Sequence, residues 1–509
     1  MLRFTYSKFS LQCYIMPEVA SAKLIILMVG LPARGKSYTV KKLARYLNWL
    51  QHSTRIFNAG DRRRVAGAGK SPTGLSWSSA NFFDPDSPEC VAMRDEIALG
   101  TLDELLYWLK YEEGSVGILD ATNSTIERRR LVLSHIRKSM NPLPGVLFLE
   151  SSCYEPAILE KNIRLKLLGP DYRVQDPTTA IKDFKQRIAN YEKSYTPIGD
   201  FEEQHGIPYM QMINVGEKIK THLIRGFLST QVVEYLLNFH LEERQIWISC
   251  NGESIDDSLG KIGRHSDLSD HGHRYSKALA RFIQQKRDEW EQVKLQPNRK
   301  PEFMKDLEGY AYDKRQSEFG WACSSDEHSR GSTDEAAIDK PNEFSIWTSM
   351  MPQAIQTATP FSNEKYNKRQ MKMLDDLNPG HVAGLTFNEI AELYPDEFAA
   401  RRRDKLLFRW SGQGGEGYVD VINRLQAVII ELERVRHHLL LVTHRAVVRV
   451  LLAYFLDLQR DDLPDMKVPK DHLFCLEPRP YGIETHTYKY LPDPDTFLPV
   501  TEDIDTILA

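Results

Sequence analysis

The sequence predicts an α/β protein with two domains, the first of which is built on a doubly wound, mostly parallel sheet. The apolar run 24–29 enters a glycine-rich turn and is followed by residues 38–50, whose apolar positions recur at helical spacing. The same change from apolar run to helical periodicity starts again at residues 245–249. Because the chain has 509 residues and a hydrophobic content of 41%, it is long enough to form a core in each domain.

The remaining elements of the first domain alternate as a parallel sheet requires. We expect two more strands, at 116–119 and 145–149, and two helices, at 95–110 and 127–138. Such alternation favours a sheet with helices on both faces. The first domain is therefore expected to span residues 23–241, after an N-terminal tail of residues 1–22.

The second domain is expected to be α/β as well and to span residues 245–493. Its pattern of an apolar run followed by helical periodicity occurs at 245–249, 344–348 and 439–443. Residues 286–342 are strongly charged, contain Ser, Gly and Pro and show little periodicity, which is typical of a mobile insertion. We expect residues 494–509 to form a C-terminal tail.

Charge and composition argue against several classes of protein. The 66 Lys and Arg residues are balanced by 70 Asp and Glu residues, so the net charge of −4 gives no global attraction to nucleic acid or to an anionic membrane. The longest apolar run, 24–31, is far shorter than the roughly 20 residues of a membrane-spanning helix. The 6 cysteines have no paired spacing, which argues against a zinc site or a disulfide framework and indicates the cytoplasm.

A phosphate-binding loop lies between the first predicted strand and helix. The run Gly30-Leu-Pro-Ala-Arg-Gly-Lys-Ser37 fits the pattern G-x-x-x-x-G-K-[ST]. Its glycines let backbone N–H groups point at phosphates, Lys36 bridges the β and γ oxygens, and Ser37 ligates Mg²⁺. We therefore expect a P-loop kinase domain that uses ATP and Mg²⁺. The expected ATP-binding residues are Gly30, Leu31, Pro32, Ala33, Arg34, Gly35, Lys36, Ser37 and Tyr38.

Asp120 is the candidate catalytic carboxylate. It ends the apolar run 116–119, which places it at the carboxyl edge of the sheet beside the phosphate loop. There it can hold the metal together with Ser37, or take the proton of an acceptor hydroxyl. The alternative is a helix-capping aspartate, because Thr122, Ser124 and Glu127 follow in a stretch rich in capping residues.

Arginines are dense around these two motifs, at positions 62–64, 94 and 128–130. A single arginine is most often a solvated surface residue. A kinase for a sugar phosphate, however, must hold an anionic acceptor close to an anionic donor, and planar guanidinium groups do this better than lysines. We therefore expect Arg63, Arg94 and Arg128 to bind the acceptor.

Further motifs carry a family resemblance. They are Phe57-Asn58-Ala59-Gly60, Asp120-Ala-Thr-Asn-Ser-Thr, Glu127-Arg-Arg and Gly169-Pro-Asp-Tyr172. Together with the phosphate loop they resemble the 6-phosphofructo-2-kinase/fructose-2,6-bisphosphatase family, and in particular a fungal-type member with a degenerate bisphosphatase domain. The resemblance implies transfer of a phosphoryl group from ATP to fructose 6-phosphate, a phosphoglycerate-mutase-like histidine phosphatase domain after the kinase, and a homodimer.

The resemblance also assigns site residues. It implies catalytic roles for Asp120 and Lys36, and it matches Cys153, in Glu-Ser-Ser-Cys-Tyr-Glu-Pro, to the active-site cysteine of the family. From residue chemistry alone, Cys153 fits a buried structural thiol equally well. Arg62 departs from the family, where a tyrosine is usual. The residues that would hold fructose 6-phosphate are Arg63, Arg94, Thr122, Arg128, Lys166, Arg187 and Tyr191.

The second domain has lost the expected nucleophile. Where the family has Arg-His-Gly-Glu at the end of a strand, this chain has Cys250-Asn251-Gly252-Glu253. An amide nitrogen cannot accept a phosphoryl group as an imidazole does, and removing a nucleophile can cost on the order of 10⁶ in rate. Cys250 as a substitute nucleophile is disfavoured, because no arginine follows it before Arg264.

Other positions of the implied phosphatase site agree with this loss. Gln353 stands where a second phosphate-holding arginine is expected, and Ala383 where the general acid is expected. The residues that remain are Glu253, Lys261 in place of an arginine, and His444, which without its partner fits a packing residue.

Three functions are compatible with these observations. The first is a 6-phosphofructo-2-kinase, important for the balance of glycolysis and gluconeogenesis, with an inactive phosphatase domain. The second is a bifunctional kinase and bisphosphatase. The third is a non-catalytic regulator that binds sugar phosphates, which conflicts with the intact Lys36, Ser37 and Asp120 because binding alone needs no metal ligand beside a γ-phosphate.

Overall fold

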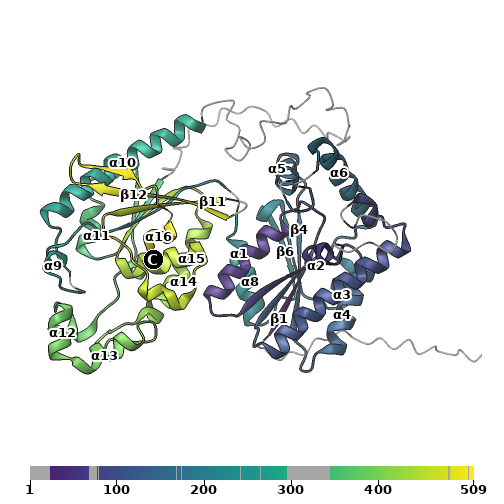
Figure 1. Cartoon of the computed structure of the whole chain (residues 1–509), viewed down its shortest axis with the longest axis horizontal. Coiled ribbons are helices and arrows are strands. Elements are labelled where there is room, and N and C mark those ends of the chain that lie inside the picture. The colour runs from purple at the N-terminus through teal and green to yellow at the C-terminus, as the bar shows by residue number, and fades with distance from the viewer. Residues whose placement is uncertain are drawn as a thin grey trace, which may run out of the picture. The chain divides into compact units, whose positions relative to one another are not determined.

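The computed structural model describes residues 23–67, 77, 79–167, 169–172, 175–240, 242–263, 265–294, 344–479, 482–502 and 504–508. The expected N-terminal tail and residues 295–342 of the expected insertion lie outside these ranges. The chain forms two compact units, 1–242 with 429–434, and 243–428 with 435–509. Figure 1 colours the first from purple to teal and most of the second from teal to yellow.

The first unit contains a six-stranded sheet with the order β2-β3-β1-β4-β5-β6. All neighbouring pairs are parallel except β5 and β6, so the predicted doubly wound, mostly parallel sheet is confirmed. Its strands are β1 (Leu24–Val29), β2 (Thr54–Asn58), β3 (Val116–Asp120), β4 (Gly145–Ser152), β5 (Tyr209–Ile213) and β6 (Lys218–His222).

Helices cover both faces of this sheet. Figure 1 shows α3 and α4 on one side and α1 and α8 on the other. The helices of the unit are α1 (Lys36–Trp49), α2 (Ala59–Ala66), α3 (Pro88–Tyr111), α4 (Ile126–Ser139), α5 (Pro156–Leu167), α6 (Pro177–Ser194), α7 (Asp200–Gln204) and α8 (Phe227–Leu237).

The central strand β1 shows why this sequence forms a buried sheet. All six of its residues are buried, because it has strand neighbours on both sides and helices on both faces. Ile25, Leu27 and Val29 pack in one cluster with side chains of α3 and α4. Full burial of such a side chain contributes about 1.5–3 kcal/mol. This packing fixes the end of β1, from which the phosphate loop starts.

The second unit contains a seven-stranded sheet with the order β13-β12-β11-β7-β10-β8-β9. Strands β7, β10, β8 and β9 are parallel, whereas β11, β12 and β13 pair antiparallel. The strands are β7 (Ile246–Cys250), β8 (Phe344–Thr348), β9 (Asn367–Gln370), β10 (His438–Thr443), β11 (His472–Arg479), β12 (Gly482–Leu491) and β13 (Thr496–Pro499).

Its helices follow the parallel strands, as the sequence predicts for an α/β domain. The longest, α10, is amphipathic and packs Tyr275, Leu279 and Ile283 into the core. The helices are α9 (Ile255–Ser258), α10 (Asp270–Lys294), α11 (Pro352–Thr357), α12 (Phe387–Leu393), α13 (Pro395–Arg403), α14 (Tyr418–Arg434), α15 (Arg445–Leu456) and α16 (Ile504–Leu508).

Two expected boundaries differ from the structure. The expected insertion begins at residue 286, but α10 continues to Lys294, and its charges form helical pairs such as Lys286 with Glu289. The expected tail after residue 493 is wrong, because β13 pairs with β12 and α16 follows it. Phe497 and Leu508, which are 3% and 5% exposed, hold these elements against the domain.

Across the described residues, every helix falls short of the length or the apolarity that crossing a bilayer requires.

Candidate active site

The phosphate loop connects the end of β1 to the start of α1 and has the backbone that its glycines allow. Gly30 and Gly35 have φ values of 135° and 87°, a region that side chains with a Cβ rarely adopt. A Cβ on Gly30 would lie 2.5 Å from the carbonyl oxygen of Ser151. The loop therefore needs glycine at both positions, as the phosphate-loop motif predicts.

Neighbouring elements hold the loop by its carbonyl groups. The hydroxyl of Ser151, on β4, donates to the carbonyl of Arg34 at 2.5 Å, and the Asn162 amide, on α5, donates to the carbonyl of Ala33 at 3.0 Å. The N–H of Gly30 donates to the carbonyl of Thr122 at 3.0 Å. The first two bonds use carbonyls of the loop and the third uses the Gly30 amide, so the contacts from Ser151 and Asn162 leave the later amide groups of the loop for an anion.

Lys36 is buried within this loop. Its Nζ donates to the carbonyls of Gly30 at 2.8 Å and Leu31 at 2.6 Å. Burial lowers the pKa of Lys36 to about 7, against the opposing effect of the nearby Asp120 carboxylate. A phosphate bound in the loop would replace these neutral acceptors by charged ones, which bind an ammonium group more strongly.

Asp120, at the end of β3, is buried and meets two side chains from other elements. The hydroxyl of Ser37 donates to Asp120 Oδ2 at 2.9 Å, and the Asn58 amide donates to the same oxygen at 2.8 Å. Asn58 and Asp120 are register partners at the ends of the parallel strands β2 and β3. The Ser37 hydroxyl and the Asp120 carboxylate are the hard oxygen ligands that Mg²⁺ prefers, so they fit the predicted metal role.

A second cluster gathers three arginines around one carboxylate. Asp171 accepts hydrogen bonds from Arg63 at 2.5 Å, Arg187 at 3.1 Å and Arg64 at 3.3 Å. Although burial opposes it, the charges of Arg63 and Arg187 hold the pKa of Asp171 below its usual value. The guanidinium groups of Arg63 and Arg187 also lie 5.2 Å and 3.9 Å from the centre of the Phe83 ring. Arg64 also pairs with Asp61, so three cations face two carboxylates, which leaves net positive charge for an anionic ligand.

Lys166 joins this arginine cluster to the phosphate loop. Burial lowers its pKa, and the charges that act on it most are those of Asp120, Arg187, Arg64 and Asp171. Lys166 also acts on Lys36. The predicted acceptor residue Lys166 is therefore close enough to feel the charges of both Asp120 and the arginine cluster.

The other predicted acceptor residues form a neighbouring group. Burial lowers the pKa of Arg94, and Tyr191 and Arg128 are among the charges that act on it. Arg94 donates to the carbonyl of Asp84 at 3.2 Å, and Arg128 pairs with Asp95. The Tyr191 ring lies 5.5 Å from that of Phe83, which ties this group to the Asp171 cluster.

Two further predicted site residues, Thr122 and Cys153, lie outside the charged clusters described above. Thr122, two residues after Asp120, is half-buried and accepts the Gly30 N–H through its backbone. Cys153, just after β4, is 1% exposed, and burial raises the pKa of its thiol despite the opposing charge of Arg34. Cys153 is therefore a neutral thiol beside the phosphate loop, which keeps both of its interpretations open. Arg62 pairs with the exposed Glu104.

Asp171, Asn58 and Asp95 have no assigned role in the sequence prediction. Asn58 and Asp171 lie within the motifs Phe57-Asn-Ala-Gly60 and Gly169-Pro-Asp-Tyr172, so their presence in a motif was the available signal. Their partners could not be predicted, because Asp171 lies 108 residues from Arg63 along the chain.

In the second unit, β7 ends at Cys250 and is followed by Asn251, and neither side chain is placed or ionised as a nucleophile would be. Burial raises the pKa of Cys250 to about 12, so a thiolate is absent at neutral pH. The Asn251 amide donates to the carbonyl of Gly252 at 2.8 Å, and its backbone N–H donates to Thr443 at 2.7 Å. The side-chain NH₂ and the backbone N–H of Asn251 are thus both used in local hydrogen bonds.

The remaining predicted residues of the phosphatase site have local contacts as well. His444 is buried and its Nε2 lies 2.7 Å from the Ser349 hydroxyl, and burial lowers its pKa, so the imidazole is neutral. Glu253 accepts a hydrogen bond from Ser269 at 2.8 Å. Lys261 forms a β-bridge with Thr386 through its backbone. Gln353 is buried on α11, and Ala383 follows a short 3₁₀ helix, where it offers no acid.

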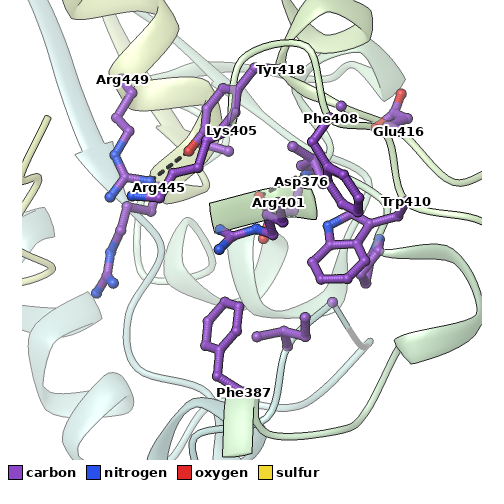
Figure 2. A pocket seen from close by; sticks show the side chains of 16 residues that line it. Asp376, Phe387, Arg401, Lys405, Phe408, Trp410, Glu416, Tyr418, Arg445 and Arg449 are labelled. Atoms are coloured by element: carbon purple, nitrogen blue, oxygen red, sulfur yellow. Dashed lines mark hydrogen bonds between the residues drawn. The ribbon is translucent and has the colours of Figure 1, made fainter. Parts of the chain in front are cut away.

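A cavity of about 230 Å³ lies within this same unit. Figure 2 shows Arg445 and Arg449 on one side of it and the rings of Phe408 and Trp410 on the other. Arg449 donates to the Tyr418 hydroxyl at 2.7 Å, as the dashed line marks. The lining side chains include the cations Arg401, Lys405, Arg445 and Arg449, the rings Phe387, Phe408, Trp410 and Tyr418, and the acids Asp376 and Glu416.

Arg401 is central to this cavity. Its guanidinium lies 4.9 Å from the Phe387 ring centre and 5.6 Å from that of Trp410, and burial lowers its pKa. A partly buried cation against aromatic faces favours an anionic ligand with apolar or sugar-like surface. The sequence prediction missed Arg401, because the run 401–403 reads as an exposed basic stretch.

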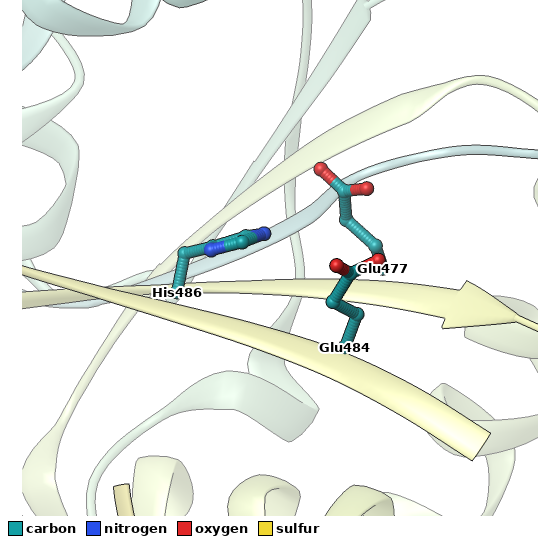
Figure 3. A group of neighbouring side chains, drawn as sticks. All are labelled: Glu477, Glu484 and His486. Carbon is teal, nitrogen blue, oxygen red and sulfur yellow. The ribbon is translucent and has the colours of Figure 1, made fainter. Parts of the chain in front are cut away.

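Figure 3 shows Glu477 of β11 beside Glu484 and His486 of β12. One ligand atom from each lies within 4.8 Å of the others. Arg479 pairs with both carboxylates, and the Gln245 amide donates to Glu477 at 2.7 Å. Because these partners already satisfy the carboxylates, we assign no metal ion to this group.

Comparison with known proteins matches two family models to the chain. The 6-phosphofructo-2-kinase model matches residues 11–243, and the model of the histidine phosphatase superfamily (branch 1) matches residues 336–490. Among solved structures, the mycobacterial glucosyl-3-phosphoglycerate phosphatase is similar over 46% of this chain and 92% of that chain, with 19% identity and a TM-score of 0.31.

Curated relatives are similar over nearly the whole chain. A Schizosaccharomyces pombe protein named a probable 6-phosphofructo-2-kinase is 42% identical over 93% of this chain and 70% of its own length. The Saccharomyces cerevisiae 6-phosphofructo-2-kinase 1 is 42% identical over 99% of this chain and 56% of its own length. The human 6-phosphofructo-2-kinase/fructose-2,6-bisphosphatase 1 is 34% identical over 92% and 85%, respectively.

Proposed function

The chain belongs to the 6-phosphofructo-2-kinase/fructose-2,6-bisphosphatase family, and we propose that its first domain transfers the γ-phosphoryl group of ATP to the 2-hydroxyl of fructose 6-phosphate. The products are ADP and fructose 2,6-bisphosphate. The observation that carries this proposal is the position of Asp120, which contacts Ser37 of the phosphate loop and lies near Lys166 beside the arginine cluster. Donor and acceptor sites thus meet at one carboxylate.

The residues of the chain divide the work of the reaction. The phosphate loop binds the ATP phosphates through its amide groups, and Lys36 pairs with the β and γ oxygens. Ser37 and Asp120 would hold Mg²⁺, which supplies positive charge at the transferred group when it is bound. Asp120 accepts the proton of the 2-hydroxyl while the new O–P bond forms and the bond between the γ-phosphorus and the ADP oxygen breaks.

The acceptor is held by two groups of residues. Arg63, Arg187 and Lys166 supply the positive charge that a 6-phosphate requires. Arg94, Arg128 and Tyr191 form the neighbouring group, with Thr122 beside Asp120. These residues are the basis for proposing an anionic sugar as acceptor rather than water.

We also propose that the enzyme works in the cytoplasm as a homodimer. The reducing cytoplasm agrees with the buried free thiols Cys90, Cys153, Cys250 and Cys475. Strand β6 is an edge strand of the first sheet. The unpaired side of an edge strand can pair with a strand of a second copy of the chain. Light scattering of the purified chain at a mass twice the monomer would support the dimer.

The second domain is proposed to have lost bisphosphatase activity. Its support is the set of contacts around Cys250, Asn251 and His444, in which an un-ionised thiol, a locally bonded amide and a neutral imidazole replace a nucleophile with its partners. The neutral imidazole of His444, which contacts Ser349, cannot supply the positive charge of the two phosphate-holding arginines whose positions Cys250 and Gln353 occupy. Hydrolysis of the 2-phosphate would therefore lack both the attacking group and its charge stabilisation.

One observation favours a second role for this domain. The cavity with Arg401, Lys405 and Arg449 keeps a basic, partly aromatic lining although the nucleophile is gone. We propose that the cavity binds a sugar phosphate without turnover, so that the domain serves regulation. The bifunctional alternative would instead require another group to act as the nucleophile in place of the histidine that is missing at position 251.

One incubation tests these proposals. The purified full chain is mixed with Mg²⁺-ATP and fructose 6-phosphate, and fructose 2,6-bisphosphate is followed over time and again after ATP has been removed. Product that accumulates and then persists supports a kinase without a phosphatase. Product that decays supports the bifunctional enzyme, and a complete lack of product contradicts the kinase proposal.

A further inference from the structure

Arg129 is fully buried and is the sequence neighbour of Arg128, one of the proposed acceptor residues. It follows Arg128 on the first turn of α4, where the Thr125 side chain caps the helix by accepting the Arg128 N–H. Consecutive helical residues point about 100° apart, so the two arginines face different surroundings. Arg128 lies with the acceptor group, whereas Arg129 is 0% exposed in the interior.

The Arg129 guanidinium joins two segments that carry acceptor residues. Its Nη1 donates to the carbonyl of Asn123 at 3.4 Å and to the carbonyl of Thr196 at 2.9 Å. Asn123 belongs to the loop that starts at Asp120, and Thr196 follows the end of α6, the helix of Arg187 and Tyr191. One side chain thus ties the catalytic loop to the acceptor helix.

Glu202 fixes the orientation of this guanidinium. Its Oε1 accepts from Arg129 Nε at 2.7 Å, its Oε2 accepts the N–H of Gly199 at 2.9 Å, and it is 0% exposed. A buried ion pair is weak evidence for stability, because an apolar pair of similar volume often serves as well. An apolar pair could not, however, make the hydrogen bonds that Arg129 donates to the carbonyls of Asn123 and Thr196.

Other contacts hold the same loop in place. The N–H of Thr196 donates to the carbonyl of Ser124 at 2.8 Å, and the Asn123 amide donates to the carbonyl of Met28 at 2.8 Å. The phosphate loop is held by Ser151 and Asn162, and it meets the Asp120 loop at the bond from the Gly30 N–H to the Thr122 carbonyl. Arg129 itself bonds to the carbonyls of Asn123 and Thr196 and not to the partners of that bond, so we expect a change at Arg129 to act more on the acceptor side than on the donor side.

We propose that Arg129 is a positioning residue for the acceptor, which sets the distance between the Asp120 loop and α6. This inference rests on the proposed kinase function. It predicts that a change at Arg129 raises KM for fructose 6-phosphate and lowers kcat, while KM for ATP stays unchanged. A displacement of about 1 Å at a reacting centre can cost on the order of 10² in rate.

Two variants separate the polar bridge from simple packing. Arg129→Lys keeps the charge, but one ammonium nitrogen cannot occupy the positions of both Nε and Nη1. The double variant Arg129→Met, Glu202→Leu replaces the pair by apolar side chains of similar size, which is the replacement that folds best at buried ion pairs. For both we expect KM for fructose 6-phosphate to rise by about tenfold and KM for ATP to change less than about twofold.

Leu133→Ala is the matched control. Leu133 lies one turn further along the same helix, is buried in the core and makes no polar contact through its side chain, so this variant lowers stability without breaking the bridge. If Leu133→Ala gives the same change in the two KM values as Arg129→Lys, the effect is one of stability and the inference is overturned. Unchanged kinetics in both Arg129 variants would overturn it as well.

Assaying the wild-type chain in parallel distinguishes a failure of the proposed kinase function from a failure of the positioning role of Arg129. A wild type that forms no fructose 2,6-bisphosphate contradicts the kinase proposal. In that case the binding of fructose 6-phosphate alone, measured by calorimetry, still tests the inference: Arg129→Lys is expected to weaken it by about tenfold, and equal affinity would refute the positioning role.

Discussion

The hydroxyl of Ser37 donates a 2.9 Å hydrogen bond to the carboxylate of Asp120, from which it is 83 residues distant along the chain. The contact arises because β1 lies next to β3 in the sheet, so the carboxyl ends of both strands open on the same edge. It places the two oxygen ligands of a phosphate-loop kinase where a single Mg²⁺ could contact both.

Asp120→Asn is expected to reduce kcat by a factor on the order of 10² to 10⁴, because the amide can neither accept the proton of the hydroxyl nor neutralise a metal ion. The amide keeps the volume of the side chain and can still bond Ser37, so the fold is retained. Steady-state assays of product formation, with circular dichroism of both proteins, measure the effect.

Asp103→Asn is the control for that variant, because Asp103 is exposed on α3 and pairs with the surface residue His135. It is expected to leave kcat unchanged. An Asp120→Asn enzyme that keeps wild-type kcat would show that Asp120 only caps local structure, which is the alternative reading of the sequence.

ATP binding is expected to weaken as the pH rises above about 7, because burial lowers the pKa of Lys36 to about 7 in the empty site. The phosphates of bound ATP favour the charged ammonium, so the bound state has the higher pKa and binding takes up a proton. Affinity is then greatest below pH 7 and falls by up to roughly tenfold per pH unit above it. Calorimetry in buffers of different ionisation enthalpy measures this proton uptake at pH 8.

Lys36→Met should bind ATP more weakly at every pH and without this proton uptake. If the wild type takes up no proton at pH 8, Lys36 is already charged in the empty site and the shift is absent.

The sequence was sufficient to predict the mostly parallel sheet of the first domain and three of its strands, and to propose a donor site at its edge. A loop motif and an aspartate at the end of an apolar run specify local structure, and parallel strand order brings both to one edge. The arginines were predicted as a group for their charge. Their arrangement around Asp171 could not be predicted, because it depends on how α2, α6 and the loop before α6 pack in three dimensions.

The second domain shows where local patterns mislead. The expected C-terminal tail, residues 494–509, contains Phe497, which inserts among Tyr275, Phe282 and Tyr490. In the same way Arg401 belongs to a basic run but faces a cavity. In both cases one side chain in tertiary contact overrides the character of its neighbours.

Phe497→Ala is expected to destabilise the second domain by about 3–5 kcal/mol, the cost of emptying a buried aromatic site. Phe497 is 3% exposed and packs on three aromatic rings. Thermal unfolding followed by tryptophan fluorescence measures the loss, with the exposed neighbour Leu498→Ala, at 45% exposure, as control. Equal melting temperatures for both variants would mean that β13 is dispensable.

Cys250 is expected to resist alkylation in the native protein at neutral pH. Burial raises its pKa to about 12 and its side chain is 2% exposed, so neither thiolate nor access is available. Intact-mass and peptide analysis after iodoacetamide treatment, before and after denaturation in guanidinium, checks this. Rapid native labelling at Cys250 would reopen the possibility of a thiolate nucleophile in the second domain.

The cavity in the second domain is expected to give the chain a second site for fructose 6-phosphate. Calorimetry without ATP should then show two sites per chain in the wild type. Arg401→Ala should remove one of them, because it deletes a cation that lies against Phe387 and Trp410 inside the cavity. Kinase turnover with saturating substrates should stay unchanged in this variant, since Arg401 lies outside the kinase domain.

Arg402→Ala is the matched control, because Arg402 is the adjacent arginine on α13, is exposed and does not line the cavity. It should retain both sites, whereas Arg63→Ala should lose the site in the kinase domain and keep the other. An Arg401→Ala variant with two sites would mean that Arg401 is not needed for binding in the cavity. A wild type with one site would mean that the cavity does not bind fructose 6-phosphate. The loss of the nucleophile would then extend to the binding of the sugar phosphate itself.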